Sequence, residues 1–319
     1  MNRTLALWLV GLCIAVSAAG QNNRPRPPIL GISHVRFHVT SLETAVHFYR
    51  DLLGMVPGNT LCKNEHLSRL TCLWVGSDQF VQIDPVQQRR PSSLLEEVAF
   101  ATPDVEGMSK FLLSHGFTYE LVAGHELVVK DDAGRVIYFG VLDPEGNRVV
   151  FEQAPKEDPA ENNHSPSRMA IHAGFVVRDR VTEDKFYRDL LGFHVYWHGG
   201  MKEGEDHWVD MQVPDGTDWL EYMLHVPADA NKHTLGVMNH IALGVPDIHA
   251  AEKQLRANGW TGTEQPKIGR DGKWQLNLYD PDDTRIEFME FAPAQKPCCS
   301  EFTGSHPGLK PPSKAPAKP

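Results

Sequence analysis

The chain has 319 residues, of which 41% are hydrophobic and 23% are charged, and its formal net charge is −10. This length and composition are typical of a globular protein with about two domains. The negative charge argues against a nucleic-acid partner or an anionic membrane surface. Phosphate-binding loops, dinucleotide fingerprints and nucleophilic triads are not apparent in the sequence.

The first twenty residues have the layout of a secretory signal peptide. Arg3 precedes the apolar run 6–19, which ends in small residues. This run is shorter than the roughly 20 apolar residues of a membrane-spanning helix. An uncleaved anchor is the alternative interpretation. We therefore expect an exported protein, periplasmic or secreted, in which residues 21–29 form a polar, proline-rich linker.

Residues 31–54 predict a strand followed by a helix. The strand Ile32–Val39 contains His34 and leads to Ser41, a helix N-cap. Apolar residues then recur at helical spacing until Gly54, where we expect the helix to end. Two further strands, near 70–75 and 80–83, complete a βαβββ unit.

A second unit of the same kind follows. A strand at 98–102 precedes the predicted helix Val105–His115, which Gly116 ends. Three more strands are expected at 126–130, 136–141 and 148–153. The polar segment 155–166 carries three prolines and is predicted to be an interdomain linker.

The second half of the chain repeats the first. Residues 167–227 resemble the first unit, since FYRDLLG occurs at 48–54 and at 186–192. His34 and His172 keep the same offset of 138 residues as Tyr49 and Tyr187. The fourth unit, 236–291, resembles the second: IALGVPDIHAA matches VAFATPDVEGM, and DPDDTRIEFME matches DPEGNRVVFE. This order, A-B-A′-B′, fixes the architecture. The tail 293–319, rich in proline and lysine, is expected to be disordered.

Four cysteines remain after removal of the signal peptide. Cys62 and Cys72 flank a segment that fits a hairpin, and an oxidising compartment would permit a disulfide between them. The adjacent Cys298 and Cys299 lie just outside the repeats. Disulfides to other cysteines, metal binding and free thiols all stay open for them. Structural or idle thiols are favoured over a catalytic role.

These motifs resemble the vicinal oxygen chelate (VOC) superfamily of glyoxalase I, extradiol dioxygenases and bleomycin-resistance proteins. The resemblance covers residues 30–292 and rests on three motifs: the His-to-FYRDLLG opening, the NHIALGVPD opening and the late DPD…IEF segment. It implies an α+β fold of four βαβββ modules in two tandem domains, 30–154 and 167–292. The strands of such modules curl around a metal ion.

The resemblance also implies metal ligands on the first and last strands of the modules. In the C-terminal half these positions hold His172, Glu221, His240 and Glu287. Two imidazoles with carboxylates suit Fe, Mn, Ni, Co or Zn, and the metal stays unidentified. Glu290, on the opposite side of the last strand, is a weaker rival.

The corresponding residues of the N-terminal half are His34, Gln82, Glu97 and Val150. Valine cannot coordinate a metal, so this half is predicted to be a degenerate copy. Modules can also be exchanged in glyoxalase-type members. That arrangement would join His34 and Gln82 to His240 and Glu287.

Three functions are open. A glyoxalase-like lyase or isomerase would use all four ligands, with Glu287 or Glu221 as base. An Fe(II) extradiol-type dioxygenase would need only His172, His240 and Glu287, but no histidine occurs in the strand 272–280, which counts against it. The third is a small-molecule-binding protein without catalysis. In each case the partner is a small molecule, and the protein is a monomer or homodimer.

Further residues of the C-terminal half are candidates for the cavity. The predicted lining residues, for which ordinary strand packing is the alternative, are Trp208, Met211, Tyr222, Trp274 and Asn277. Lys267, Arg270 and Lys273 are interpreted as solvated loop charges in preference to contacts for an anionic substrate. Glutathione is a doubtful substrate for an exported protein.

Overall fold

The computed structural model of the chain describes residues 25–58, 71–85, 94–154 and 164–308. The predicted signal peptide, Cys62, residues 21–24 of the first predicted linker and residues 155–163 of the second lie outside these ranges. Cys72 is disulfide-bonded. Within the described ranges, no helix has the length and apolar character needed to cross a membrane.

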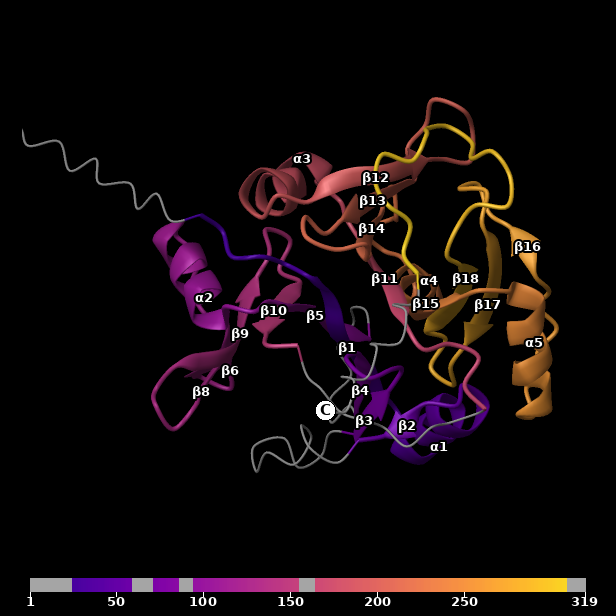
Figure 1. Cartoon of the computed structure of the whole chain (residues 1–319), viewed down its shortest axis with the longest axis horizontal. Coiled ribbons are helices and arrows are strands. Elements are labelled where there is room, and N and C mark those ends of the chain that lie inside the picture. The colour runs from indigo at the N-terminus through magenta and orange to yellow at the C-terminus, as the bar shows by residue number, and fades with distance from the viewer. Residues whose placement is uncertain (1–24, 59–70, 86–93, 155–163, 309–319) are drawn as a thin grey trace, which may run out of the picture.

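The two halves of the chain form two eight-stranded sheets of the same topology (Figure 1). The first has the order β2-β3-β4-β1-β5-β10-β9-β8. Its strands are β1 (Gly31–Val39), β2 (Val56–Pro57), β3 (Thr71–Trp74), β4 (Phe80–Pro85), β5 (Leu95–Ala101), β8 (Val128–Lys130), β9 (Val136–Leu142) and β10 (Arg148–Glu152). A separate hairpin contains β6 (Leu121–Val122) and β7 (His125–Glu126).

The second sheet has the order β12-β13-β14-β11-β15-β18-β17-β16, which is the same arrangement. Its strands are β11 (Ala170–Val176), β12 (His194–Gly199), β13 (Trp208–Gln212), β14 (Trp219–Met223), β15 (His240–Val245), β16 (Lys267–Ile268), β17 (Trp274–Tyr279) and β18 (Arg285–Glu290). The α+β fold and the tandem modules predicted from the sequence are confirmed. In both sheets the first strands of the two modules pair at the centre, each beside the last strand of its own module.

The helices pack on the sheets through apolar faces and begin at polar caps. They are α1 (Leu42–Val46), α2 (Val105–Ser114), α3 (Arg180–Asp184), α4 (Lys232–Met238) and α5 (Ile248–Ala257). Side chains of Ser41, Asp104 and Asp247 accept backbone N–H groups at the starts of α1, α2 and α5.

Both copies of FYRDLLG contain a π-helical turn that the sequence did not predict. Helix α1 continues into η1 (His47–Leu52), and α3 into η4 (Lys185–Leu190). The turn buries two successive aromatic residues of each copy, for example Phe48 and Tyr49. A regular α-helix turns neighbouring side chains about 100° apart, so the wider turn serves the burial of both rings.

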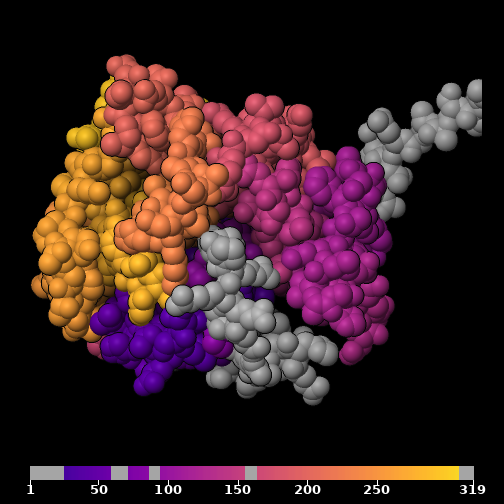
Figure 2. Space-filling view, turned by 180° about the vertical axis from the view of Figure 1, so that it is seen from behind, coloured from indigo at the N-terminus to yellow at the C-terminus, as the bar shows by residue number. Residues whose placement is uncertain are grey.

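Hydrogen bonds between side chains of the repeated motifs connect the two halves. The Tyr49 hydroxyl, in the first unit, donates to Asp280 in the fourth at 2.9 Å. The Tyr187 hydroxyl, in the third unit, donates to Asp143 in the second at 3.1 Å. Each FYRDLLG tyrosine is therefore satisfied by the Asp-Pro turn of the opposite half. Figure 2 shows the indigo first unit against the orange to yellow fourth unit, and the magenta second unit beside the third.

A buried carboxylate at this junction makes stability depend on pH. Glu183 accepts a hydrogen bond from the Glu145 amide at 2.9 Å. Burial, reinforced by nearby Asp143, raises the pKa of the Glu183 carboxyl from 4.5 to about 8. Because the folded protein binds this proton more tightly than the unfolded chain, Glu183 contributes stability that is fully present below pH 4.5. This contribution is lost as pH rises through 8.

We therefore expect the Tm of the wild type to fall more steeply between pH 5 and pH 8 than that of Glu183→Gln. Differential scanning calorimetry across this range measures the difference. Glu203→Gln, which removes an exposed carboxylate, should follow the wild-type profile. Parallel profiles for the wild type and Glu183→Gln would contradict the assignment.

The tail differs from its prediction. Residues 293–308 are ordered, and the Thr303 amide donates to the carbonyl oxygen of Tyr196 on edge strand β12 at 3.0 Å. The prediction of disorder is wrong for these residues, while 309–319 lie outside the described ranges. Composition alone predicts disorder for this segment, but Phe302 packs against an aromatic cluster of the second sheet and holds the segment in place.

Candidate metal centre

Four predicted side chains converge on one face of the second sheet. His172 comes from the central strand β11 and His240 from the central strand β15. The Nε2 atoms of the two histidines lie 3.1 Å apart. Glu221 Oε2, from β14, lies 3.1 Å from His240 Nε2. Glu287 Oε2, from β18, lies 3.7 Å from His240 Nε2 and 3.8 Å from His172 Nε2. Donor atoms of His172, His240 and Glu287 all lie within 4.8 Å of one another.

A glycine makes room for this arrangement. A Cβ atom at Gly174 would lie 2.0 Å from His240 Cε1, closer than any side chain tolerates. At the equivalent position of the first unit, 138 residues earlier, the chain has Arg36. The imidazole of His240 therefore occupies space that exists only in the C-terminal half.

Gly174→Ala is expected to displace the His240 ring and to weaken binding of a divalent cation by roughly tenfold or more, as a disturbed ligand orientation does. Isothermal titration with Mn²⁺ or Zn²⁺ measures the affinity, and far-UV circular dichroism checks the fold. Gly308→Ala is the control, because nothing lies within 4 Å of a Cβ there. Unchanged affinity in Gly174→Ala would show that His240 does not bind the cation.

The electrostatics suit metal ligation. Burial lowers the pKa values of His172 and His240 well below 6.5, which keeps both imidazoles neutral, so that each ring has one nitrogen lone pair. Burial also raises the pKa values of Glu221 and Glu287. In the described part of the chain, His172 Nδ1 and Glu221 Oε2 have no hydrogen-bond partner. Neutral imidazoles and buried carboxylates of this kind fit a divalent transition metal.

Arg285 also lies at this site, although it was not among the residues predicted from the sequence. Its Nη2 lies 2.6 Å from His240 Nε2, 3.6 Å from Glu221 Oε2 and 3.8 Å from Glu287 Oε2. Arg285 precedes Glu287 by two residues in the same strand, so both side chains point to the same face. That periodicity could have found it. The guanidinium supplies positive charge among the carboxylates.

The interior beside these residues is more polar than a protein core. Asp210 Oδ1, Trp219 Nε1 and Asn277 Oδ1 are buried and have no hydrogen-bond partner among the described residues. Asn277 lies opposite Glu287 in the β17–β18 pairing, as expected for a residue of the cavity. Unpartnered buried polar groups are rare in native proteins, so we expect a bound molecule or water to satisfy these atoms.

Other cavity predictions need correction. Lys273 was interpreted as a solvated charge, but it is fully buried. Its Nζ lies 3.3 Å from the Tyr196 hydroxyl and 4.4 Å from the centre of the Trp219 ring. Met211 and Tyr222 pack in the main hydrophobic core, because their strands turn alternate residues to the other face.

The N-terminal half holds an ion-pair network at the corresponding positions. His34 contacts Glu97 at 2.9 Å and Glu152 at 2.7 Å. Burial opposes its protonation, but Glu152 and Glu97 outweigh this effect and raise the pKa of His34 to about 9. A protonated imidazole has no lone pair for a metal. Val150, at the position that corresponds to Glu287, is fully buried, and the degenerate copy stays a prediction.

The guanidinium of Arg36 contacts two residues of this network. Arg36 Nε donates to Gln82 Oε1 at 2.9 Å, and Arg36 Nη2 lies 3.0 Å from Glu97 Oε1. Because His34 and Gln82 belong to the first sheet and His240 to the second, the exchanged ligand set is not assembled. The rival residue Glu290 instead accepts the Ile248 amide at the start of α5, at 3.0 Å.

Comparisons with known proteins agree with this geometry. The model of the Glyoxalase/Bleomycin resistance protein/Dioxygenase superfamily matches residues 170–288, which include all four converging residues. A lactoylglutathione lyase of Haemophilus influenzae is 30% identical over 122 residues, or 38% of this chain and 90% of the relative. The chain belongs to the Glyoxalase/Bleomycin resistance protein/Dioxygenase superfamily.

Solved structures show the same fold over both halves. The 2,3-dioxygenase LapB from Pseudomonas sp. KL28 has a TM-score of 0.59 at 17% identity, covering 92% of this chain and 97% of that protein. Homoprotocatechuate 2,3-dioxygenase from Brevibacterium fuscum has a TM-score of 0.60 at 20% identity, covering 88% and 84%. Within the matched residues, the group formed by His172, His240 and Glu287 could bind a metal ion.

Proposed function

We propose that this protein is a divalent-metal-dependent, glyoxalase-like isomerase or lyase that acts on a small substrate with oxygens on neighbouring carbons. His172, His240, Glu221 and Glu287 would hold the metal. The observation that carries the proposal is the position of Glu221, whose Oε2 lies 3.1 Å from His240 Nε2. It adds a second carboxylate to a site that already has a complete three-residue group.

The two carboxylates differ in their surroundings. The side chain of Glu221 is 14% exposed and that of Glu287 is 3% exposed. Glu221 is therefore the better candidate for a base that leaves the ligand set and moves a proton at the substrate carbon. Burial raises its pKa, which makes the carboxylate a stronger base near neutral pH. The bound cation would act as a Lewis acid toward negative charge on a substrate oxygen.

The roles of the carboxylates are tested by comparing Glu221→Gln with the wild type. We expect the variant to keep its metal, because the group of His172, His240 and Glu287 stays complete, but to lose roughly 10²- to 10⁴-fold in kcat, as removal of a general base does. Metal content and turnover of adducts between 2-oxoaldehydes and thiols are the two readouts. Full turnover in Glu221→Gln would exclude this residue as the base.

An Fe(II) dioxygenase is the second candidate. It is supported by the tight group His172, His240 and Glu287, since two histidines and one carboxylate are a ligand set of such oxygenases. Asn277, which faces Glu287 from β17, cannot transfer protons as a histidine would. Oxygen uptake by the Fe(II)-loaded protein with catechols would favour the dioxygenase. Ligand binding without turnover in either assay would indicate a binding protein.

A further inference from the structure

The ordered tail forms a strap, defined here as residues 298–306, along edge strand β12. Ser300 Oγ accepts the His198 amide and donates to the His198 carbonyl oxygen, both at 2.9 Å. Farther along, Gln212 Nε2 donates to the Ser305 carbonyl oxygen at 2.9 Å. The strap is thus held by hydrogen bonds to β12 and β13, as a short added strand would be.

The strap also packs against the aromatic residues beside the polar interior. The Phe302 ring lies 4.8 Å from that of Tyr196, and Lys273 Nζ lies 5.2 Å from the Phe302 ring centre. Tyr196 in turn lies 5.2 Å from Trp219, whose ring is 4.8 Å from that of His172. A continuous series of ring contacts therefore leads from the strap to a proposed metal ligand.

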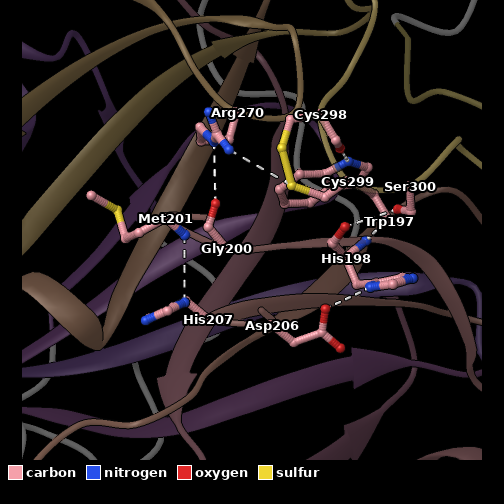
Figure 3. Close-up of a disulfide and its surroundings, with 10 residues drawn as sticks. All are labelled: Trp197, His198, Gly200, Met201, Asp206, His207, Arg270, Cys298, Cys299 and Ser300. Atoms are coloured by element: carbon pink, nitrogen blue, oxygen red, sulfur yellow. Dashed lines mark hydrogen bonds and ion pairs between the residues drawn. A yellow bond between two sulfur atoms is a disulfide. The ribbon is translucent and has the colours of Figure 1, made fainter. Parts of the chain in front are cut away.

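A disulfide between the adjacent residues Cys298 and Cys299 begins the strap (Figure 3). Trp197 Nε1 donates to the Cys298 carbonyl oxygen at 3.1 Å, and the Cys298 amide donates to the Arg270 carbonyl oxygen at 2.8 Å. Arg270 Nε donates to the Gly200 carbonyl oxygen at 3.1 Å. These hydrogen bonds connect the residues of the disulfide to β12 and to the loop 269–273, which carries Lys273.

The backbone at this point is strained. Cys299 has a φ of 75°, in the left-handed region that residues other than glycine seldom adopt. The small ring closed by the disulfide restrains this conformation. Once the sulfurs separate, Cys299 can return to ordinary backbone angles, and the anchoring bonds of Cys298 lose the restraint that positions them.

A small thiol can reach the bond. Cys299 is exposed and lines a cavity of about 480 Å³ together with Arg178, His198, Asp206 and His225. Arg270 Nη2 lies 3.9 Å from Cys299 Sγ, where its positive charge would stabilise a departing thiolate. Access and a stabilised leaving group are the two requirements for thiol–disulfide exchange.

We propose that Cys298–Cys299 is a thiol–disulfide exchange site, reduced by a small dithiol, that controls whether the strap closes the interior. The thiolate of the dithiol forms a bond to the exposed Cys299 Sγ, and the Cys298–Cys299 bond breaks with its electron pair on Cys298 Sγ. The second thiol of the dithiol then attacks the reductant sulfur of this mixed disulfide and releases Cys299 as a thiolate beside Arg270. The products are two protein thiols, after uptake of the two protons, and the cyclic disulfide of the reductant.

Hydrogen exchange of the full-length protein with and without dithiothreitol tests this proposal. We expect reduction to speed amide exchange in peptides covering 300–306 and 194–199 by roughly tenfold, because their hydrogen bonds open locally. Exchange in α2, in the other half, should stay unchanged. Cys298→Ser/Cys299→Ser should exchange fast in the strap at the outset and show no further response to dithiothreitol.

Dithiothreitol can also reduce the disulfide of Cys72, so Cys72→Ser is the matched control and should keep the wild-type response of the strap. Native alkylation followed by mass spectrometry establishes the starting state. Free thiols at both Cys298 and Cys299 before reduction would overturn the proposal. Unchanged amide exchange of the strap in the wild type after complete reduction of Cys298 and Cys299 would also overturn the proposal. Neither readout depends on bound metal or on turnover.

Discussion

Purified His240→Ala and Glu287→Ala are expected to contain no stoichiometric divalent metal, whereas the wild type contains about one ion for each chain. Loss of a partner that only orients a ligand costs about 10- to 100-fold in affinity, so loss of a ligand itself should cost at least 100-fold. Each variant also leaves buried carboxylate or imidazole groups unpaired. Elemental analysis by mass spectrometry after dialysis measures the metal content.

Glu290→Ala is the control for this pair of variants. Glu290 lies on the same strand but accepts the Ile248 amide, at 3.0 Å. Its removal should lower stability by about 1 kcal/mol, as loss of a helix cap does, and leave the metal in place. Equal metal content in the wild type, His240→Ala and Glu287→Ala would show that the site lies elsewhere.

Arg36→Met is expected to lower the free energy of unfolding by roughly 3 kcal/mol, because it breaks a buried ion pair and leaves charge on Glu97 without its guanidinium. The figure is at the lower end for such changes, since Glu97 keeps His34 at 2.9 Å and Arg148 at 3.3 Å. Urea denaturation followed by tryptophan fluorescence measures the loss.

The double variant Arg36→Met/Glu97→Gln separates charge from packing. If the uncompensated carboxylate causes the loss, removing its charge should restore part of the stability. The wild type and Arg36→Met should bind metal equally, because the C-terminal half holds the proposed ligands. An Arg36→Met variant as stable as the wild type would show that the N-terminal network contributes little to the fold.

Internal repetition made much of this protein predictable. Aligning the four units placed His172, Glu221, His240 and Glu287 at equivalent strand positions, and strands that share a sheet bring such positions together. The same alignment identified Val150 as a position without a ligand. Both predictions rested on the resemblance to the VOC superfamily, which implies that metal ligands lie on the first and last strands of the modules.

Other features depend on how far side chains reach and are not encoded in spacing. Arg285 crosses to His240 on the neighbouring strand, and Arg36 reaches both Gln82 and Glu97. Lys273 follows two glycines and three charged residues, a pattern typical of an exposed loop, yet aromatic rings and the strap enclose it. Such burial depends on segments that meet only after the sheets have formed.

The hydrogen bonds of Tyr49 and Tyr187 connect the N-terminal half to the proposed metal site. Asp280, the acceptor for Tyr49, begins the turn that leads directly into the strand of Glu287. The N-terminal half thus contacts the proposed metal site as an attached subunit would, through the hydrogen bond from Tyr49 to Asp280. Because the attachment is intramolecular, its effective concentration is fixed by the chain. Dilution that would separate two free subunits leaves this support in place.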